Sequence, residues 1–162
     1  MRKLSKVLKL LKSSIQNHNI QIETFYFQDL IINGYPNEFL QVIINILNNA
    51  KDALVQIEKN QRFIEIRTYI KNKRCYVEIL DNGGGVDENI ISKVFEPYFT
   101  TKHKYQGTGI GLYMSHQIIV EHMKGSIYLK NIEIEKNDKL FKGCCVTLEI
   151  PTKKENFTDY II

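Results

Sequence analysis

The stretch Asp81-Asn82-Gly83-Gly84-Gly85-Val86 decides how the rest of the sequence is interpreted. It follows an alternating strand pattern over residues 75–80, and strands rarely end in three glycines for packing reasons. Glycine is used where φ must be positive or where a backbone must approach another group closely. An aspartate at the head of such a turn fixes a carboxylate acceptor at a strand end, and one candidate partner is the amino group of a purine. The alternative is a plain β-turn in which Asp81 and Asn82 bond their own backbone.

The whole chain has the properties of one globular domain, with 162 residues of which 43% are hydrophobic. The net charge is +4, and because Lys and Arg are spread along the chain, no nucleic-acid partner is predicted. An odd number of cysteines (Cys75, Cys144 and Cys145) fits a reducing cytosol, and the adjacent pair would point to opposite faces of a strand. No apolar run reaches the ~20 residues that span a bilayer, and there is no secretion signal. We therefore expect a soluble, cytoplasmic domain without membrane contact of its own, which is compatible with a parent protein anchored in the inner membrane.

Hydrophobic periodicity predicts the order of the secondary-structure elements. Helices are expected over residues 2–17, 37–58, 87–93 and 112–122, and strands over 20–25, 62–70, 75–80, 126–131 and 143–150. Because strands come in pairs with few helices between them, the order predicts an α+β fold. This is a two-layer α/β sandwich, whose mixed and mostly antiparallel sheet carries helices on one face. A doubly wound parallel sheet would need a stricter alternation of strands and helices.

The long predicted helix carries a polar stripe formed by Asn45, Asn48, Asn49 and Asp52, at positions i, i+3, i+4 and i+7. Asparagine gains little in a helix interior, so three of them in an otherwise apolar helix need an explanation. The stripe is either the solvent face of the helix or a row of oxygen ligands. Side-chain amide oxygens coordinate Mg²⁺, which takes few protein ligands beside phosphate oxygens and water.

Two further segments carry candidate ligand contacts. Gly107-Thr108-Gly109-Ile110-Gly111-Leu112 opens a predicted helix, where exposed N–H groups and the helix dipole favour an anion. It does not follow a strand directly, so the dinucleotide fingerprint is not matched, and the sequence has no ordinary P-loop. Between the two glycine clusters, Phe95-Glu96-Pro97-Tyr98-Phe99-Thr100-Thr101-Lys102 is either a lid whose second half turns toward phosphates or a surface loop with an aromatic anchor.

Taken together and in this order, the four segments resemble the N box, first glycine box, phenylalanine box and second glycine box of bacterial sensor histidine kinases. The resemblance implies the Bergerat ATP-binding fold, which gyrase B, heat-shock chaperones and mismatch-repair ATPases share. It covers roughly Met1 to Pro151. Residues 1–151 would then form the catalytic and ATP-binding domain, with a lid at about 96–107, and residues 152–162 would form a C-terminal tail of unassigned role.

The same resemblance implies ATP and Mg²⁺ as ligands and gives each matching residue a role. Asn49 would ligate Mg²⁺, with Asn45 beside the phosphates and the metal's waters, and these two would be the catalytic residues. Asp81 would accept the adenine amino group, while Gly83 and Gly85 let the base lie against the backbone. Lys51, two residues from Asn49, should face away. The other implied nucleotide contacts are Asp52, Lys102, Gly107, Thr108, Gly109, Ile110, Gly111 and Leu112.

One departure from the family pattern concerns the phosphoacceptor histidine, which in sensor kinases lies on a helical hairpin before this domain, next to an acidic residue. None of the four histidines here matches it: His18, His103, His116 and His122. The chain is therefore expected to transfer the γ-phosphoryl group of ATP to a histidine on a hairpin that it lacks, from which a response regulator takes it. Two alternatives share the fold, namely a serine/threonine kinase of the anti-sigma-factor type and a nucleotide-sensing module that binds without transfer.

Overall fold

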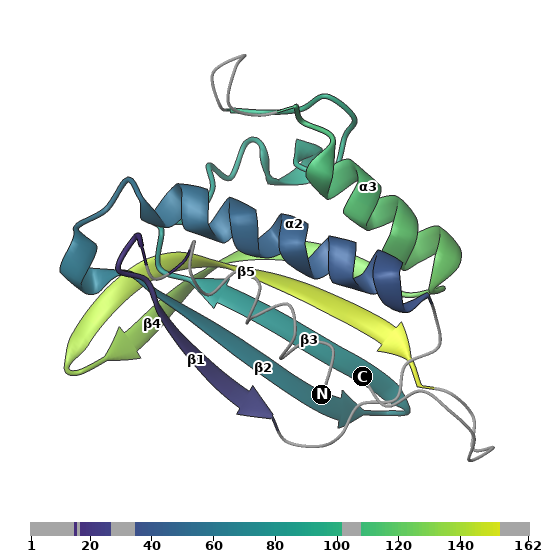
Figure 1. Cartoon of the computed structure of the whole chain (residues 1–162), viewed down its shortest axis with the longest axis horizontal. Helices are drawn as coiled ribbons and strands as arrows, with labels where there is room; N and C mark the ends of the chain where they lie inside the picture. The colour runs from purple at the N-terminus through teal and green to yellow at the C-terminus, as the bar shows by residue number, and fades with distance from the viewer. Residues whose placement is uncertain (1–14, 16, 27–34, 102–107, 153–162) are drawn as a thin grey trace.

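The computed structural model describes residue 15 and residues 17–26, 35–101 and 108–152 of the chain (Figure 1). Five strands are present in this part: β1 (Gln21–Tyr26), β2 (Phe63–Lys71), β3 (Arg74–Asp81), β4 (Ser126–Lys136) and β5 (Lys139–Pro151). The helices are α2 (Pro36–Leu54) and α3 (Gly111–Gln117), which continues as a π-helical turn over Ile118–His122, and there are 3₁₀ turns at Lys59–Gln61 and Ile91–Lys93. No helix among these residues is long and apolar enough to cross a membrane.

The strands form one mixed sheet in the order β1-β2-β3-β5-β4. Only the β1–β2 pair is parallel, and the other three pairs are antiparallel. Helices α2 and α3 lie side by side across one face of this sheet (Figure 1). The predicted two-layer α/β sandwich is therefore confirmed, including its mixed, mostly antiparallel sheet and its single helical layer.

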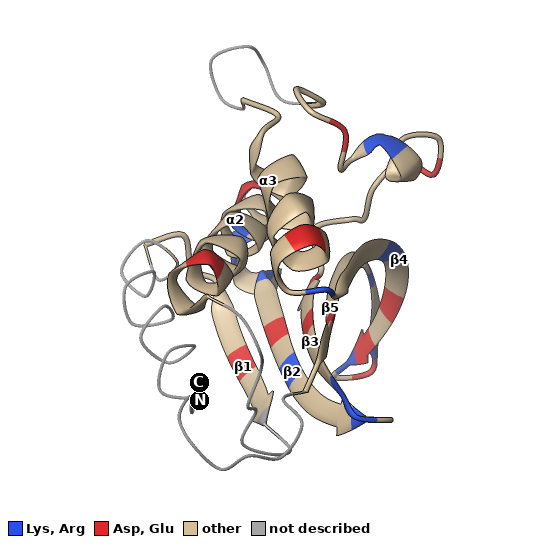
Figure 2. Cartoon of the chain, turned by 90° about the vertical axis from the view of Figure 1, so that its right-hand side faces the viewer, with Lys and Arg blue, Asp and Glu red and all other residues tan. Residues whose placement is uncertain are grey.

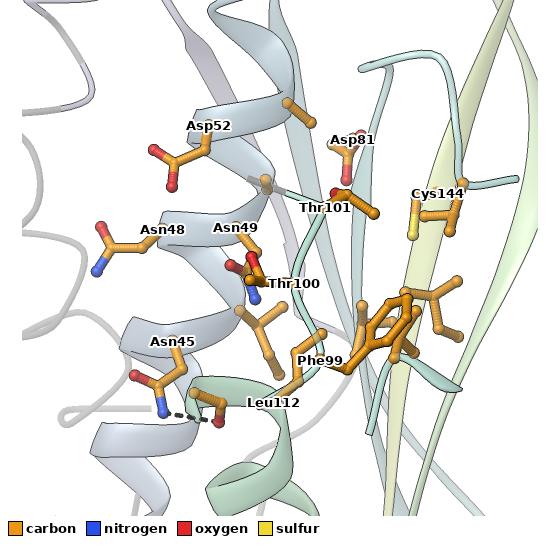
Figure 3. Close-up of a pocket in the computed structure, with 18 of the residues that line it drawn as sticks. Asn45, Asn48, Asn49, Asp52, Asp81, Phe99, Thr100, Thr101, Leu112 and Cys144 are labelled. Carbon is orange, nitrogen blue, oxygen red and sulfur yellow. Dashed lines mark hydrogen bonds between the residues drawn. The ribbon is translucent and has the colours of Figure 1, made fainter. Parts of the chain in front are cut away.

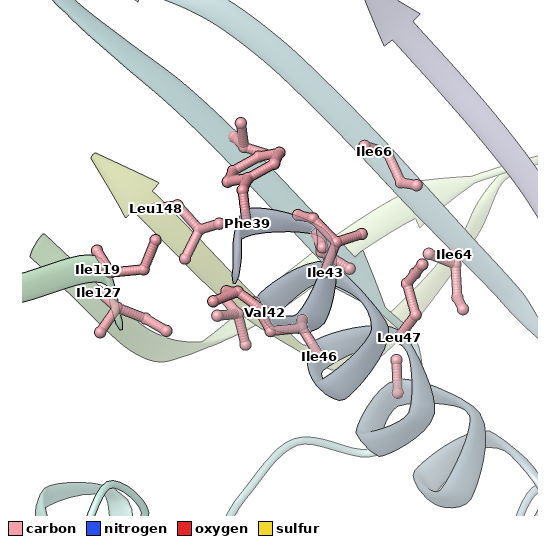
Figure 4. Close-up of a cluster of buried hydrophobic side chains, with 14 of the residues drawn as sticks. Phe39, Val42, Ile43, Ile46, Leu47, Ile64, Ile66, Ile119, Ile127 and Leu148 are labelled. Atoms are coloured by element: carbon pink, nitrogen blue, oxygen red, sulfur yellow. The ribbon is translucent and has the colours of Figure 1, made fainter. Parts of the chain in front are cut away.

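The core is built on α2, because its apolar residues recur at helical spacing and so lie on one face of the helix. These residues are Phe39, Val42, Ile43, Ile46, Leu47, Ala50 and Leu54. They pack on the inward side chains of the central strands, among them Ile64, Ile66 and Leu148, which are fully buried (Figure 4). This packing holds the polar flank of α2 at a fixed height above the sheet.

Helix α2 ends at Leu54, four residues before the predicted end at Glu58. A buried arginine donates hydrogen bonds to the carbonyl groups that follow this end. The Arg62 guanidinium donates to the carbonyls of Val55 at 2.8 Å, Ile57 at 2.7 Å and His18 at 2.9 Å. A cation is favourable at the negative end of the helix dipole. Arg62 thus joins the end of α2 to the residues that precede β1.

The β4–β5 hairpin is longer than the sequence predicted. Pairing continues to Lys136 and Lys139, where Asn137 and Asp138 form a tight turn with φ values of 52° and 57°. The extension covers a second apolar cluster on the sheet face away from the helices, formed by Phe63, Leu80, Ile134 and Cys145. Cys144 packs in the main core instead, which confirms that the two adjacent cysteines point to opposite faces.

Two other elements differ from their predictions or fall outside the described residues. The short helix predicted over residues 87–93 is wrong: Asp87 opens a turn in which its Oδ1 accepts the Asn89 N–H at 2.9 Å, and only the 3₁₀ turn at Ile91–Lys93 follows. The helix predicted over residues 2–17 lies almost wholly outside the described part of the chain. Acidic and basic positions are interspersed along the ribbon of the strands in Figure 2. One pair joins two strands, since Lys136 Nζ lies 2.6 Å from Glu23 Oε1.

Candidate functional site

A cavity of about 850 Å³ lies between α2, the start of α3 and the end of the sheet where β3 leaves its last residue (Figure 3). Its wall is made by segments far apart in the sequence. One side carries polar residues of α2, and the floor carries apolar residues of β3, β4 and β5 (Ile79, Leu129 and Val146). The rim carries residues 99–101 together with Thr108, Gly109, Gly111 and Leu112. The fold thus gathers the four segments quoted above around one space.

Most of the site residues predicted from the sequence line this cavity. They are Asn45, Asn49, Asp52, Asp81, Gly85, Thr108, Gly109, Gly111 and Leu112. Gly83 and Ile110 do not line it: Gly83 is packed between Asp81 and α2, and Ile110 is 37% exposed. Lys102 and Gly107 lie outside the described residues. Lys51 is absent from the wall, as expected, and its Nζ lies 4.0 Å from Asp52 Oδ1.

Asp81 is the buried acidic group of the cavity, with 6% of its surface exposed. Burial raises the pKa of its carboxyl group to about 6, although the Gly83 N–H, which donates to Oδ1 at 2.8 Å, acts in the opposite direction. A carboxylate held at a strand end in apolar surroundings is a strong acceptor for a donor that enters the cavity. The burial of Asp81 lowers the stability of the folded protein at neutral pH, because the charged carboxylate is poorly solvated there.

The first glycine cluster is explained by close approach at one position and by positive φ at the next two. A β-carbon on Gly83 would lie 2.7 Å from Ala53 Cβ, so the turn passes directly against α2. Gly84 and Gly85 have φ values of 93° and 83°, which favour glycine. The β-turn alternative is partly right, since Asp81 does bond within its own turn. Asn82, however, accepts the Phe63 N–H at 2.9 Å and thereby ties the turn to β2.

Asn131 on β4 is a residue that the sequence reasoning missed. Its Oδ1 accepts the Val86 N–H at 2.7 Å, and its Nδ2 donates to the Val86 carbonyl at 2.7 Å, so its amide imitates a neighbouring strand. The same Oδ1 fills the space in which a β-carbon on Gly85 would lie, at 2.6 Å. Asn131 therefore fixes the glycine turn from the far edge of the sheet. The available signal was an asparagine within an alternating strand pattern.

The polar stripe of α2 lies along the cavity wall, with Asn45, Asn48, Asn49 and Asp52 on the same flank of the helix (Figure 3). This position in a cavity wall favours the row of oxygen ligands over a plain solvent face. Asn45 bridges to the neighbouring helix, because its Nδ2 donates to the Gly111 carbonyl at 3.2 Å and to Ser115 Oγ at 3.3 Å. Its side chain thus holds α3 against α2 at the edge of the cavity.

The second glycine cluster meets the phenylalanine-rich segment across the rim of the cavity. Gly109 has a φ of 65°, and a β-carbon there would lie 2.4 Å from the Tyr98 carbonyl carbon, so only glycine fits. Beyond this contact Phe99, Thr100 and Thr101 line the cavity (Figure 3). The aromatic anchor is also present, since the Phe95 ring lies 5.8 Å from the His116 ring on α3.

This donor set suits a ligand with a polar base at one end and phosphates at the other. Asp81 offers an acceptor beside apolar walls, as a purine requires, and the amide oxygens of α2 suit a hard cation such as Mg²⁺. The backbone of Gly109 and Gly111 faces the same space from the opposite side. The roles of the individual residues stay predictions from this chemistry.

Comparison with known protein families gives one match that covers most of the chain. The profile described as "Histidine kinase-, DNA gyrase B-, and HSP90-like ATPase" matches residues 34–154. The two-component sensor PprA of Pseudomonas aeruginosa is 37% identical over 131 residues, which are 76% of this chain and 14% of PprA. The chain therefore spans a small part of that relative.

Solved structures give a match over nearly the whole chain. The catalytic domain of histidine kinase ThkA, in a nucleotide-free form, is 26% identical with a TM-score of 0.77, covering 93% of this chain and 91% of that domain. ThkA in complex with the response regulator protein TrrA gives a TM-score of 0.73 at 23% identity, covering 94% of this chain and 40% of that one.

Proposed function

Because the chain belongs to the family of histidine kinase-, DNA gyrase B- and HSP90-like ATPases, we propose that it is the ATP-binding catalytic domain of a two-component sensor histidine kinase. The observation that carries this proposal is the single cavity that unites Asp81, the α2 stripe and both glycine clusters. The likeness to PprA and to the ThkA catalytic domain favours a sensor kinase over the other branches of the family. The domain comprises residues 1–151, with a lid at about 96–107.

In this proposal the residues of the cavity hold ATP by its two ends. The Asp81 carboxylate accepts a hydrogen bond from the adenine amino group, and the Gly85 turn leaves the base room against the backbone. Asn49 ligates Mg²⁺, whose charge offsets that of the phosphates during transfer. Asn45, Asp52 and the residues of the second glycine cluster surround the triphosphate, with Lys102 adding a positive charge.

Phosphoryl transfer depends mainly on positioning and charge neutralisation, so the acceptor must be brought to the phosphate end of the cavity. Among the described histidines none lines the cavity: the His122 Nδ1 lies 2.8 Å from Glu38 Oε2, and the His116 ring packs on Phe95. We therefore place the acceptor histidine on a separate helical hairpin of the parent kinase. A response regulator, such as the one that ThkA binds, would take the phosphoryl group next.

The test is incubation of this chain with Mg²⁺ and γ-labelled ATP, with and without a separately produced phosphoacceptor hairpin from a sensor kinase. We expect label on the hairpin only, in an acid-labile and base-stable linkage typical of phosphohistidine. Asn49→Asp is expected to abolish this transfer, and Asn137→Asp, in the exposed β4–β5 turn, is the matched control. Label on His18, His103, His116 or His122 without the hairpin contradicts the proposal. Acid-stable label on a protein partner would favour the serine/threonine kinase, and binding without any transfer would favour the sensing module.

A further inference from the structure

A fully buried hydroxyl group joins the two helices that flank the cavity. Ser115 lies on the second turn of α3 and has no exposed surface. Its Oγ donates to the Gly111 carbonyl at 2.8 Å and accepts from Asn45 Nδ2 at 3.3 Å. The same Nδ2 reaches the Gly111 carbonyl at 3.2 Å, so Asn45, Gly111 and Ser115 form a closed triangle of hydrogen bonds.

Both the nitrogen and the oxygen of the Asn45 amide are engaged in hydrogen bonds. The Nδ2 group has two hydrogens, which suffice for Gly111 and Ser115, and the Oδ1 accepts from Gln41 Nε2 at 3.0 Å. The resemblance places Asn45 next to the phosphates, but in this structure its amide is engaged in holding α3. A satisfied polar network between packed elements rigidifies them, whereas a half-satisfied one costs stability.

The triangle connects α2 and the start of α3, the two helices that flank the cavity. Asn45 precedes Asn49 by one helical turn, so both lie on the same flank of α2. Gly111 opens α3 on the other side and lines the cavity together with Gly109. Fixing Asn45 to Gly111 therefore fixes the spacing between the amide of Asn49 and the glycine backbone.

We propose that Ser115 is a positioning residue that sets the distance between the metal-binding flank of α2 and the phosphate-facing start of α3. This inference rests on the proposed function and adds a residue that does not itself line the cavity. Because Asp81 lies at the other end of the cavity, the base contact should not depend on Ser115. The triphosphate contact should depend on it, since the phosphates are held from both helices at once.

The experiment uses calorimetry to measure how tightly the wild type and Ser115→Ala bind two ligands. One ligand is a non-hydrolysable ATP analogue in the presence of Mg²⁺, and the other is adenosine. We expect Ser115→Ala to raise the dissociation constant of the analogue about fivefold, which corresponds to the loss of one hydrogen bond. The dissociation constant of adenosine should change less than about twofold. The matched control is Thr147→Val, which removes another buried hydroxyl, on the sheet face away from the helices. It should change neither dissociation constant.

The outcomes separate the inference from the proposed function. A wild-type chain that binds neither ligand refutes the proposed function. A wild type that binds both, with Ser115→Ala unchanged or weakened equally for both, refutes the positioning role alone. If Ser115→Ala does not fold, Ser115→Cys, with similar volume and a weaker donor, takes its place. The same selective loss for the ATP analogue is then expected, and equal affinities with the wild type overturn the inference.

Discussion

The substitution Asp81→Asn should stabilise the free protein at neutral pH while it abolishes nucleotide binding. Asp81 is 6% exposed, and burial raises the pKa of its carboxyl group from 3.8 to about 6. Since the folded pKa lies above the unfolded one, folding favours the protonated form. The stability that this carboxyl contributes is fully present below pH ~3.8 and is lost as the pH rises through about 6.

The size of the effect follows from the two pKa values. The difference between 3.8 and about 6 corresponds to about 3 kcal/mol between the fully protonated and fully ionised group. Roughly 2.5 kcal/mol of this falls between pH 4 and pH 8, because the unfolded group is already partly ionised at pH 4. Asparagine cannot ionise, so the variant does not incur this loss. The free energy of unfolding of Asp81→Asn should therefore gain about that much over the wild type across this range.

The assay is urea unfolding of both proteins at pH 4, 6 and 8, without nucleotide. Subtracting the two curves removes the contribution of other titrating groups that lie far from Asp81. The control is Asp138→Asn, the same substitution in the exposed β4–β5 turn, where no burial cost applies. A difference between Asp81→Asn and the wild type that stays constant with pH would refute the reasoning. So would an unchanged affinity of the variant for ATP, since the carboxylate would then not hold the base.

Three further substitutions test the supports of the site. Gly83→Ala should lower stability by about 1–3 kcal/mol and weaken ATP binding, because the new methyl overlaps Ala53; urea unfolding and calorimetry measure both, and a neutral effect contradicts the close approach. Asn131→Ala should remove both hydrogen bonds to Val86 and weaken ATP binding several-fold. Asn131→Asp should retain part of the affinity, because its carboxylate can still accept the Val86 N–H. Arg62→Met should cost about 3 kcal/mol or more in unfolding free energy with ATP affinity nearly unchanged, since its carbonyl partners lose their donors away from the cavity.

Much of this fold is predictable because its signals are local. The apolar residues of α2 recur at helical spacing, and the strand pairs alternate with a period of two, so element type and order follow from the sequence. The glycines at Gly84, Gly85 and Gly109 mark positive φ values that few other residues adopt. Such features depend on neighbours within a few residues, and a reader of the sequence sees those neighbours.

The features that escaped prediction depend on partners far away in the chain. The end of α2 is set by Arg62, which also donates to the His18 carbonyl 44 residues earlier, and the Val86 turn is set by Asn131, which lies 45 residues further along. The β4–β5 hairpin extends because Ile134 and Phe141 pack with Phe63 on the sheet face away from the helices. Nothing local distinguishes these residues from ordinary surface residues. Only the sheet order, which places β5 beside β3 and β4 beyond β5, gives them their partners.

The geometry of the cavity follows from the packing of a single helix. The apolar face of α2 fixes its rotation on the sheet through buried contacts such as Ile43 and Leu47. Once that face is fixed, the asparagines on the adjacent flank have no freedom in where they point, because they sit at set angles on the same helix. Asn45 then carries this orientation to α3 through Gly111. A core substitution that rotates α2, such as Ile43→Ala, should therefore impair phosphate contacts from a distance. Phe141→Ala, whose ring lies 5.5 Å from that of Phe63 and packs against the second cluster, should lower stability alone.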